Sequence, residues 1–165
     1  MLDHKIKAVI NNNNSVELDM NEVLRSGLRH FCKTSYTDNI VFMQQLGYQD
    51  ANDNDVYEGD VLELKITKEL MNHNKNMFFN SSLGQYIEKE GDITSVILVN
   101  KYDKHFMSMD YELYFCKNNR IERDNDGIPY AHNIGDDKTF PQYLCYKGAT
   151  IIGNIVLDKT ILDNM

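Results

Sequence analysis

Residues 57–66, with the sequence YEGDVLELKI, decide the fold of this 165-residue chain. Gly59 can adopt the positive φ of a tight turn or a β-bulge, and the Asp60 carboxylate can accept hydrogen bonds from nearby backbone N–H groups. Apolar and charged residues then alternate, which is typical of a strand with one face in the core. We expect Leu62, Leu64 and Ile66 on the core face, and Val61 and Glu63 on a face that meets solvent.

Strand-like patterns recur along the rest of the chain. The apolar run at 6–10, four asparagines and the alternating residues 15–18 predict an N-terminal hairpin. Further strands are expected at residues 40–43, 56–57, 93–99, 111–115, 140–146 and 150–157, with turns at 101–104, 118–119 and 124–127. Gly153 interrupts the last strand and predicts the kind of sharp bend that a small β-barrel needs.

Helical signals are few. Apolar residues recur at helical spacing over residues 22–32, with Asp19 or Asn21 as the cap, and predict one short helix. Residues 68–91 mix asparagines with sparse apolar residues and predict a short helix or a mobile segment. The chain has only two Pro and no Pro/Gly/Ser linker, so we expect one domain over residues 1–165. The predicted fold is mainly β, with α+β as the alternative: a small, partly open β-barrel with a helix near residues 20–32 and a long variable insertion over about 67–148.

The acidic composition of the chain limits the kinds of macromolecule that it is expected to bind. The chain has 25 Asp and Glu against 17 Lys and Arg, and its formal net charge is -8. Nonspecific binding to nucleic acid depends on Lys and Arg displacing phosphate counterions, so a nucleic-acid partner is not expected. The acidity fits a surface that imitates nucleic acid and occupies a basic groove, and it equally fits plain solubility. With no signal sequence and no long apolar run, we expect a cytoplasmic protein that does not engage a membrane.

Cysteine and histidine give no sign of a metal site. Cys32, Cys116 and Cys145 are widely spaced and odd in number, which predicts reduced, buried thiols. The five histidines show no metal-binding spacing and are expected to be structural or exposed.

Three sets of residues permit sharper interpretations, each with a structural alternative. Asp50, Asn52 and Asn54 have the spacing of a calcium loop but lack its glycine and its closing glutamate, so an Asx-rich turn is favoured. Asp55, Glu63 and Lys65 could imitate the core of a metal-dependent nuclease. The aromatic residues of the region 102–115 could stack on single-stranded bases or fill the core, and few cations accompany them. This set comprises Tyr102, Phe106, Tyr111, Tyr114 and Phe115.

Two segments carry a resemblance to a known family. Residues 42–61, with the sequence FMQQLGYQDANDNDVYEGDV, resemble the signature block of the YopX family of bacteriophage and prophage proteins, and residues 151–155, IIGNI, resemble its closing block. The chain departs from the family pattern at Asp53, where a turn Gly is usual, at Tyr48, where Leu is usual, and at 159–160, where Asn-Pro is usual. The family's Trp-containing N-terminal segment is missing. The residues that carry the motif are Gly47, Asp50, Tyr57, Glu58, Gly59, Asp60, Gly153 and Asn154.

The resemblance implies a β-rich, phage-encoded intracellular protein that self-associates and belongs to a family with no established catalytic role. It supplies no catalytic, cofactor-binding or metal-binding residues, so the motif residues are interpreted as structural. We therefore expect a non-enzymatic accessory protein of the bacterial cytoplasm. Such a protein would form a homo-oligomer through exposed strand edges and bind a host or phage macromolecule through its acidic surface. The alternatives are a metal-dependent hydrolase or nuclease and a small nucleic-acid-binding β-barrel.

Overall fold

The computed structural model describes residues 5–10, 14–19, 40–68, 70, 92–103, 108–134 and 139–165. The expected helix at 22–32, nearly all of the segment 68–91 and Cys32 lie outside these residues. At the start of that segment Lys68 and Leu70 are helical, and the Leu70 amide donates a hydrogen bond of 3.0 Å to Thr67 Oγ1, as at a helix N-cap.

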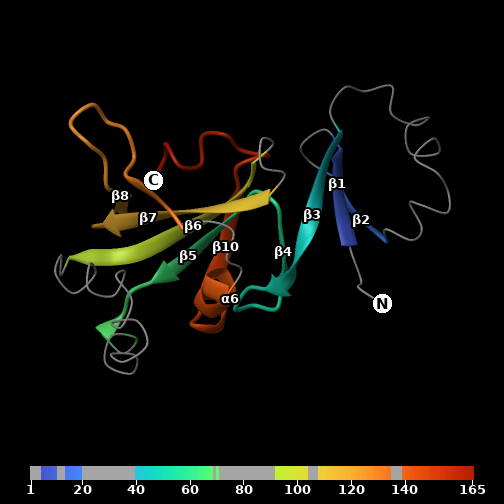
Figure 1. The fold of residues 1–165 in the computed structure, drawn as a ribbon, viewed down its shortest axis with the longest axis horizontal. Helices are drawn as coiled ribbons and strands as arrows, with labels where there is room; N and C mark the ends of the chain where they lie inside the picture. Colours follow the sequence, from blue (N-terminus) through green and yellow to red (C-terminus); the bar gives the residue numbers. More distant parts are fainter. Residues whose placement is uncertain are drawn as a thin grey trace.

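The protein is mainly β and builds two antiparallel sheets (Figure 1). The first has the strand order β2-β1-β3-β4, and the second has the order β10-β5-β6-β7-β8, with β9 paired to β7. The strands of the first sheet are β1 (Lys5–Ile10), β2 (Asn14–Asp19), β3 (Ile40–Gln49) and β4 (Asp55–Tyr57). Those of the second are β5 (Asp60–Lys65), β6 (Ile93–Asp103), β7 (Ser108–Lys117), β8 (Arg120–Ile121), β9 (Ala131–Asn133) and β10 (Thr150–Asn154). The second sheet curls into part of a barrel, which confirms the predicted fold class.

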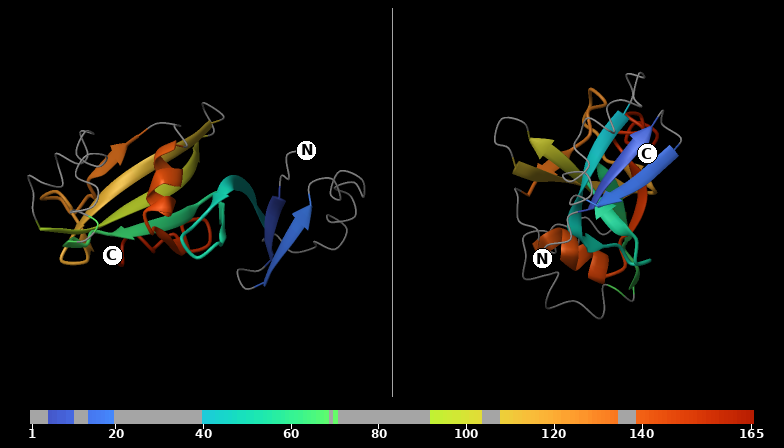
Figure 2. Two further views of the ribbon diagram at one scale, coloured as in Figure 1. Left: turned by 90° about the horizontal axis from the view of Figure 1, so that it is seen from below. Right: turned by 90° about the vertical axis from the view of Figure 1, so that its right-hand side faces the viewer.

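The N-terminal hairpin is confirmed: β1 and β2 pair antiparallel, and β1 also pairs with residues 40–44 of β3. β3 then turns to β4, which it meets at Gln45 and Gln49 with a register shift between them. Gly47 lies in this irregularity at a φ of 83°, a backbone conformation that glycine adopts without strain. Two views show the hairpin projecting away from the six-stranded sheet, with β3 leading from one to the other (Figure 2).

Residues 60–65 form β5 as predicted, and the face expected to meet solvent is only partly exposed: Lys65 is exposed and Glu63 half-buried, but Val61 is buried. Leu62 and Leu64 pack into a core that also contains residues of β6, β7 and the helix α6 (Thr139–Tyr146). Val61, expected to meet solvent, is 0% exposed, because the C-terminal residues Ile161 and Leu162 fold back over that face. Two apolar layers on one sheet therefore replace the single core face that the alternation predicted.

The expected strand at 140–146 is wrong, because these residues form α6. Phe140 and Leu144 are four residues apart and both pack against the core, and Pro141 lies in the first turn, where its missing N–H costs nothing. The helix ends in a Schellman motif: Gly148, at a φ of 109°, donates to Cys145 O, and Ala149 donates to Leu144 O. That glycine is the signal in the sequence that could have revealed the helix.

Two strand boundaries also differ from prediction. β10 ends at Asn154 rather than at Leu157, and residues 155–157 form a turn. β6 continues through the expected turn at 101–104 as far as Asp103. The turns at 118–119 and 124–127 are confirmed, with positive φ at Asn118, Asn119 and Gly127. Since β6 to β9 fall within 67–148, that stretch supplies much of the main sheet. The assignment of a single domain stays a prediction.

Candidate functional site

Most motif residues meet where β4, β5 and β10 converge, and Asp60 lies at the centre. Its side chain is 7% exposed; Oδ2 accepts a hydrogen bond of 2.7 Å from the Tyr57 amide, and Oδ1 accepts one of 2.9 Å from Asn154 Nδ2. Burial raises the pKa of Asp60, although these two hydrogen bonds and the positive charge of Lys7 act in the opposite direction. The carboxyl group therefore joins two segments that are far apart in the sequence.

Asn154 completes this junction. Its Nδ2 also donates to Glu58 O at 3.0 Å, and its Oδ1 accepts from the Val156 amide at 2.9 Å. Gly59 lies against it with a φ of 82°, and a Cβ atom there would lie 2.6 Å from Val156 Cγ2 and 2.9 Å from Asn154 Oδ1. The expected turn and hydrogen bonding at 59–60 are therefore confirmed, and both the backbone angle and the close approach require glycine.

A buried hydrogen-bonded pair, Tyr48 and Asn100, contacts the same junction and was not revealed by the sequence. Asn100, which is 0% exposed on β6, donates from Nδ2 to Asp60 O at 3.0 Å and accepts from the Tyr48 hydroxyl at 3.2 Å. Burial and neighbouring groups raise the pKa of Tyr48, so its hydroxyl stays a donor. The available signal was an asparagine directly after the long apolar run of β6, where a polar side chain must find partners.

Asp50 forms a second structural centre. Its Oδ1 accepts hydrogen bonds of 2.9 Å from the amides of Asn52 and Asn54, and its Oδ2 accepts one of 3.0 Å from the amide of Ile151 on β10. Burial by itself would raise the pKa of Asp50, but the hydrogen bonds outweigh it and hold the pKa below the usual value. The favoured Asx-rich turn is confirmed, because backbone amides occupy the oxygens that a calcium ion would need.

A polar cavity of about 630 Å³ opens beside both centres, between β1 and the main sheet. Its lining residues are Lys7, Gln49, Asp53, Asn54, Asp55, Tyr57, Asp60 and Ile151. The Lys7 ammonium lies over the Tyr57 ring, with Nζ 5.3 Å from the ring centroid. Asp55 accepts a hydrogen bond of 3.0 Å from Gln49 Nε2 at the rim. The cavity thus combines carboxylates, an aromatic face and a cation from the protein's own hairpin.

The three residues of the nuclease alternative line different cavities. Asp55 lines the larger cavity, whereas Glu63 and Lys65 line a second one of about 340 Å³ beside Thr150. Among the residues that the structure describes, no three His, Cys, Asp or Glu side chains lie close enough to hold a metal ion. The structure therefore does not bring Asp55 into one cavity with Glu63 and Lys65.

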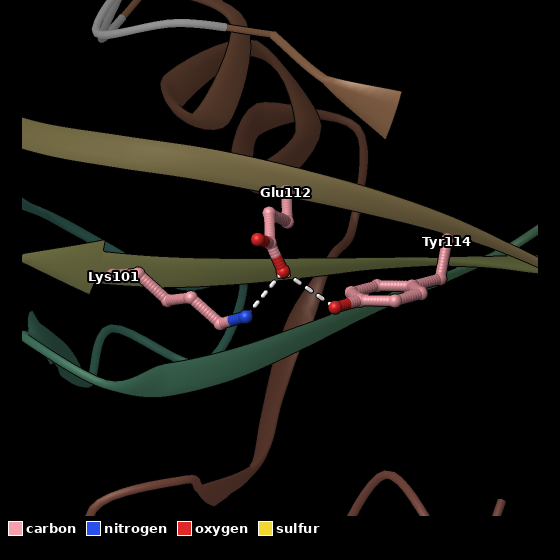
Figure 3. Close-up of polar contacts among 3 residues, drawn as sticks. All are labelled: Lys101, Glu112 and Tyr114. Carbon is pink, nitrogen blue, oxygen red and sulfur yellow. Dashed lines mark hydrogen bonds and ion pairs between the residues drawn. The ribbon is translucent and has the colours of Figure 1, made fainter. Parts of the chain in front are cut away.

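The aromatic residues of β7 fill the core, as the structural alternative predicted. Tyr111, Tyr114 and Phe115 are buried, so their rings are not available to stack on bases. The side chains of Tyr102 and Phe106 lie outside the described part of the chain. Figure 3 shows that Lys101 on β6 and the Tyr114 hydroxyl both reach one oxygen of Glu112, the hydroxyl at 2.5 Å. Burial and this carboxylate raise the pKa of Tyr114, which keeps the phenol neutral at the margin of the core.

The described cysteines and histidine agree with their predicted roles. Cys116 and Cys145 are buried free thiols, and burial raises the pKa of Cys145 to about 11, with a smaller contribution from Asp50. His132 is exposed on β9. No helix among the described residues is long and apolar enough to cross a membrane.

The fold and the site define a mainly β protein in which buried polar side chains fix the strand junctions beneath a polar cavity. A family model described as YopX protein matches residues 3–156, and the chain therefore belongs to the YopX family. Neither a curated protein nor a solved structure matches the chain.

Proposed function

We propose that this YopX-family protein is a non-enzymatic phage or prophage accessory protein that binds a host or phage macromolecule in the bacterial cytoplasm. The observation that carries the proposal is the use made of its buried polar groups. These buried groups form hydrogen bonds with backbone amides, with backbone carbonyls and with one another; they are Asp50, Asp60, Asn100 and Asn154. Groups held in this way stabilise a scaffold and leave recognition to the surface.

The charge of that surface supports a basic partner. With a formal net charge of -8, the protein attracts cationic surfaces over a distance of about 10 Å at 0.1 M salt. Exposed or half-exposed carboxylates lie in turns at Asp53 and Asp126, at the start of β4 at Asp55 and near the C-terminus at Asp163. Binding through such groups weakens with salt, which separates it from binding through apolar contacts.

The experiment is a capture assay with the purified protein in bacterial lysate at low salt, followed by elution with a salt gradient. We expect a discrete partner that elutes as ionic strength rises. The double variant Asp53→Asn with Asp55→Asn removes two charges beside the cavity, and Asp126→Asn with Asp163→Asn removes two elsewhere as the matched control. A protein that retains nothing at low salt would exclude this function.

Self-association belongs to the same proposal. β2 ends the strand order of the four-stranded sheet, so one of its edges faces no other described strand. An unpaired edge of six residues can pair with its counterpart in a second copy, and such pairing is self-complementary when antiparallel. Sedimentation at micromolar concentration tests this part; a single 19.2 kDa species would exclude it.

A further inference from the structure

The larger cavity already holds a cation that belongs to the protein. Lys7 extends from β1 into a space lined by Asp53, Asp55 and Asp60, and its ammonium lies over the face of Tyr57. The positive charge of Lys7 also acts to lower the pKa of Asp60 at the base of the cavity. An aromatic face flanked by carboxylates attracts cations by two independent effects, the ring quadrupole and Coulomb attraction.

We propose that this cavity is the site that receives a basic side chain of the partner, and that Lys7 occupies it in the free protein as an internal competitor. The inference rests on the proposed function and names the chemistry of the ligand: a guanidinium group. A guanidinium is planar, stacks on a tyrosine ring and donates hydrogen bonds to carboxylates in a fork. It is also more weakly hydrated than an ammonium, so it displaces Lys7 in preference to a lysine.

The position of Lys7 on the hairpin lets its ammonium group leave the cavity without disrupting the sheet. The backbone of Lys7 is held on both sides, opposite Glu17 of β2 and opposite Met43 of β3. The ammonium can therefore leave the ring while the strand pairing stays intact, because only side-chain torsions change. Lys7 is thus a weak competitor tethered to the protein, and a cation that binds the cavity more tightly displaces it.

The first arm of the test uses the full-length protein and a blocked triarginine peptide, with the tricitrulline peptide as the neutral control of the same shape. Two-dimensional NMR follows the backbone amides of Tyr57, Asp60 and Ile151 during the titration. We expect saturable shifts at these amides with triarginine and none with tricitrulline. Equal shifts with both peptides, or shifts confined to another face, would overturn the inference.

The second arm tests the competition directly. Lys7→Met removes the internal cation and keeps an unbranched apolar side chain, and we expect triarginine to bind about two- to fivefold more tightly, the worth of one exposed cation–π contact. Lys159→Met makes the same change of charge at an exposed position away from the cavity and is expected to leave the affinity unchanged. Equal gains in both variants would reduce the effect to overall charge and contradict a competitive role for Lys7.

The third arm removes a carboxylate. Asp55→Asn keeps an acceptor for Gln49 and should weaken triarginine binding about two- to fivefold, whereas Asp163→Asn should not. Circular dichroism and thermal unfolding establish that each variant is folded. If salt-sensitive capture from lysate persists equally in Asp55→Asn and Asp163→Asn, the proposed function stands and the cavity is not its site. If capture itself fails, the proposed function falls.

Discussion

Asp50 Oδ2 accepts a hydrogen bond of 3.0 Å from the amide of Ile151, which lies 101 residues further along the chain. Beside it, the Ala51 amide donates to Ala149 O at 2.9 Å. β10 is the last strand in the order of its sheet, and among the described strands it pairs with β5 alone. The turn around Asp50 therefore caps the outer edge of β10, which restricts pairing with another chain at this edge.

We expect Asp50→Asn to lower the free energy of unfolding at pH 7 by about 1.5–3 kcal/mol, the range for a hydrogen bond to a charged group. The amide retains one oxygen acceptor, but it cannot accept from the turn and from Ile151 through two oxygens. Urea denaturation measures the change. Asp163→Asn, at an exposed position, is the control and should change stability by less than about 0.5 kcal/mol.

The contribution of Asp50 should depend on pH with a definite sign. Because hydrogen bonds hold the pKa of Asp50 below its unfolded value, the stabilisation is present above the unfolded pKa and is lost as pH falls through the lowered folded pKa. The difference in unfolding free energy between wild type and Asp50→Asn should therefore shrink from pH 7 to pH 2. Asp60, whose pKa is raised chiefly by burial and to a smaller extent by the charge of Asp50, acts in the opposite direction, and the part due to burial is common to both proteins. A difference that stays constant over this range would contradict the assignment.

Two glycines should respond differently to alanine. In Gly59→Ala the alanine must adopt the left-handed backbone conformation of this turn, which costs about 1–2 kcal/mol. Its Cβ atom also clashes with the Val156 side chain. Gly153→Ala meets only the flexible end of the Ile161 side chain. Thermal unfolding should therefore show that Ile161→Val restores much of the stability lost in Gly153→Ala. Val156→Ala should not restore Gly59→Ala to the same degree, since the backbone strain remains.

Tyr48→Phe tests the buried pair with Asn100. Removing the hydroxyl leaves Asn100 Oδ1 without this donor in an interior where the side chain is fully buried, and we expect a loss of about 1–3 kcal/mol. Tyr130→Phe is the matched control, because that ring is 54% exposed and water can solvate its hydroxyl. Equal stability of the two variants in urea would show that the pair contributes nothing.

Asp53 occupies a position where the family pattern has a turn glycine, and it adopts a φ of 62°. This angle explains the family preference, since an L-residue with a Cβ is strained there. We expect Asp53→Gly to be more stable than Asp53→Ala by about 1–2 kcal/mol in thermal unfolding. Two variants of equal stability would mean that the turn relaxes to another conformation.

The sequence was sufficient to predict the structure wherever residues close together in the chain determine it. The turn at Gly59 and Asp60, the Asx-rich turn at Asp50 and the strand from Val61 onward were all predictable, because a side chain within a few residues satisfies or shapes the backbone. The family blocks also follow from these residues, since they include the positions at which the backbone needs glycine or a capping carboxylate. The interpretation of these motif residues as structural rests on the same contacts.

What the sequence alone determined is thus a mainly β chain with its bends and turns, since side-chain period and turn chemistry are local properties. Tertiary contacts alone made 140–146 a helix, covered Val61 on the second face of β5 and brought Lys7 over Tyr57. Each of these depends on which distant segment packs against which. A short apolar run such as 140–146 is compatible with either a strand or a helix until the segments that pack against it are known. Contacts between residues 7 and 57, or 61 and 161, produce no periodic pattern in the sequence.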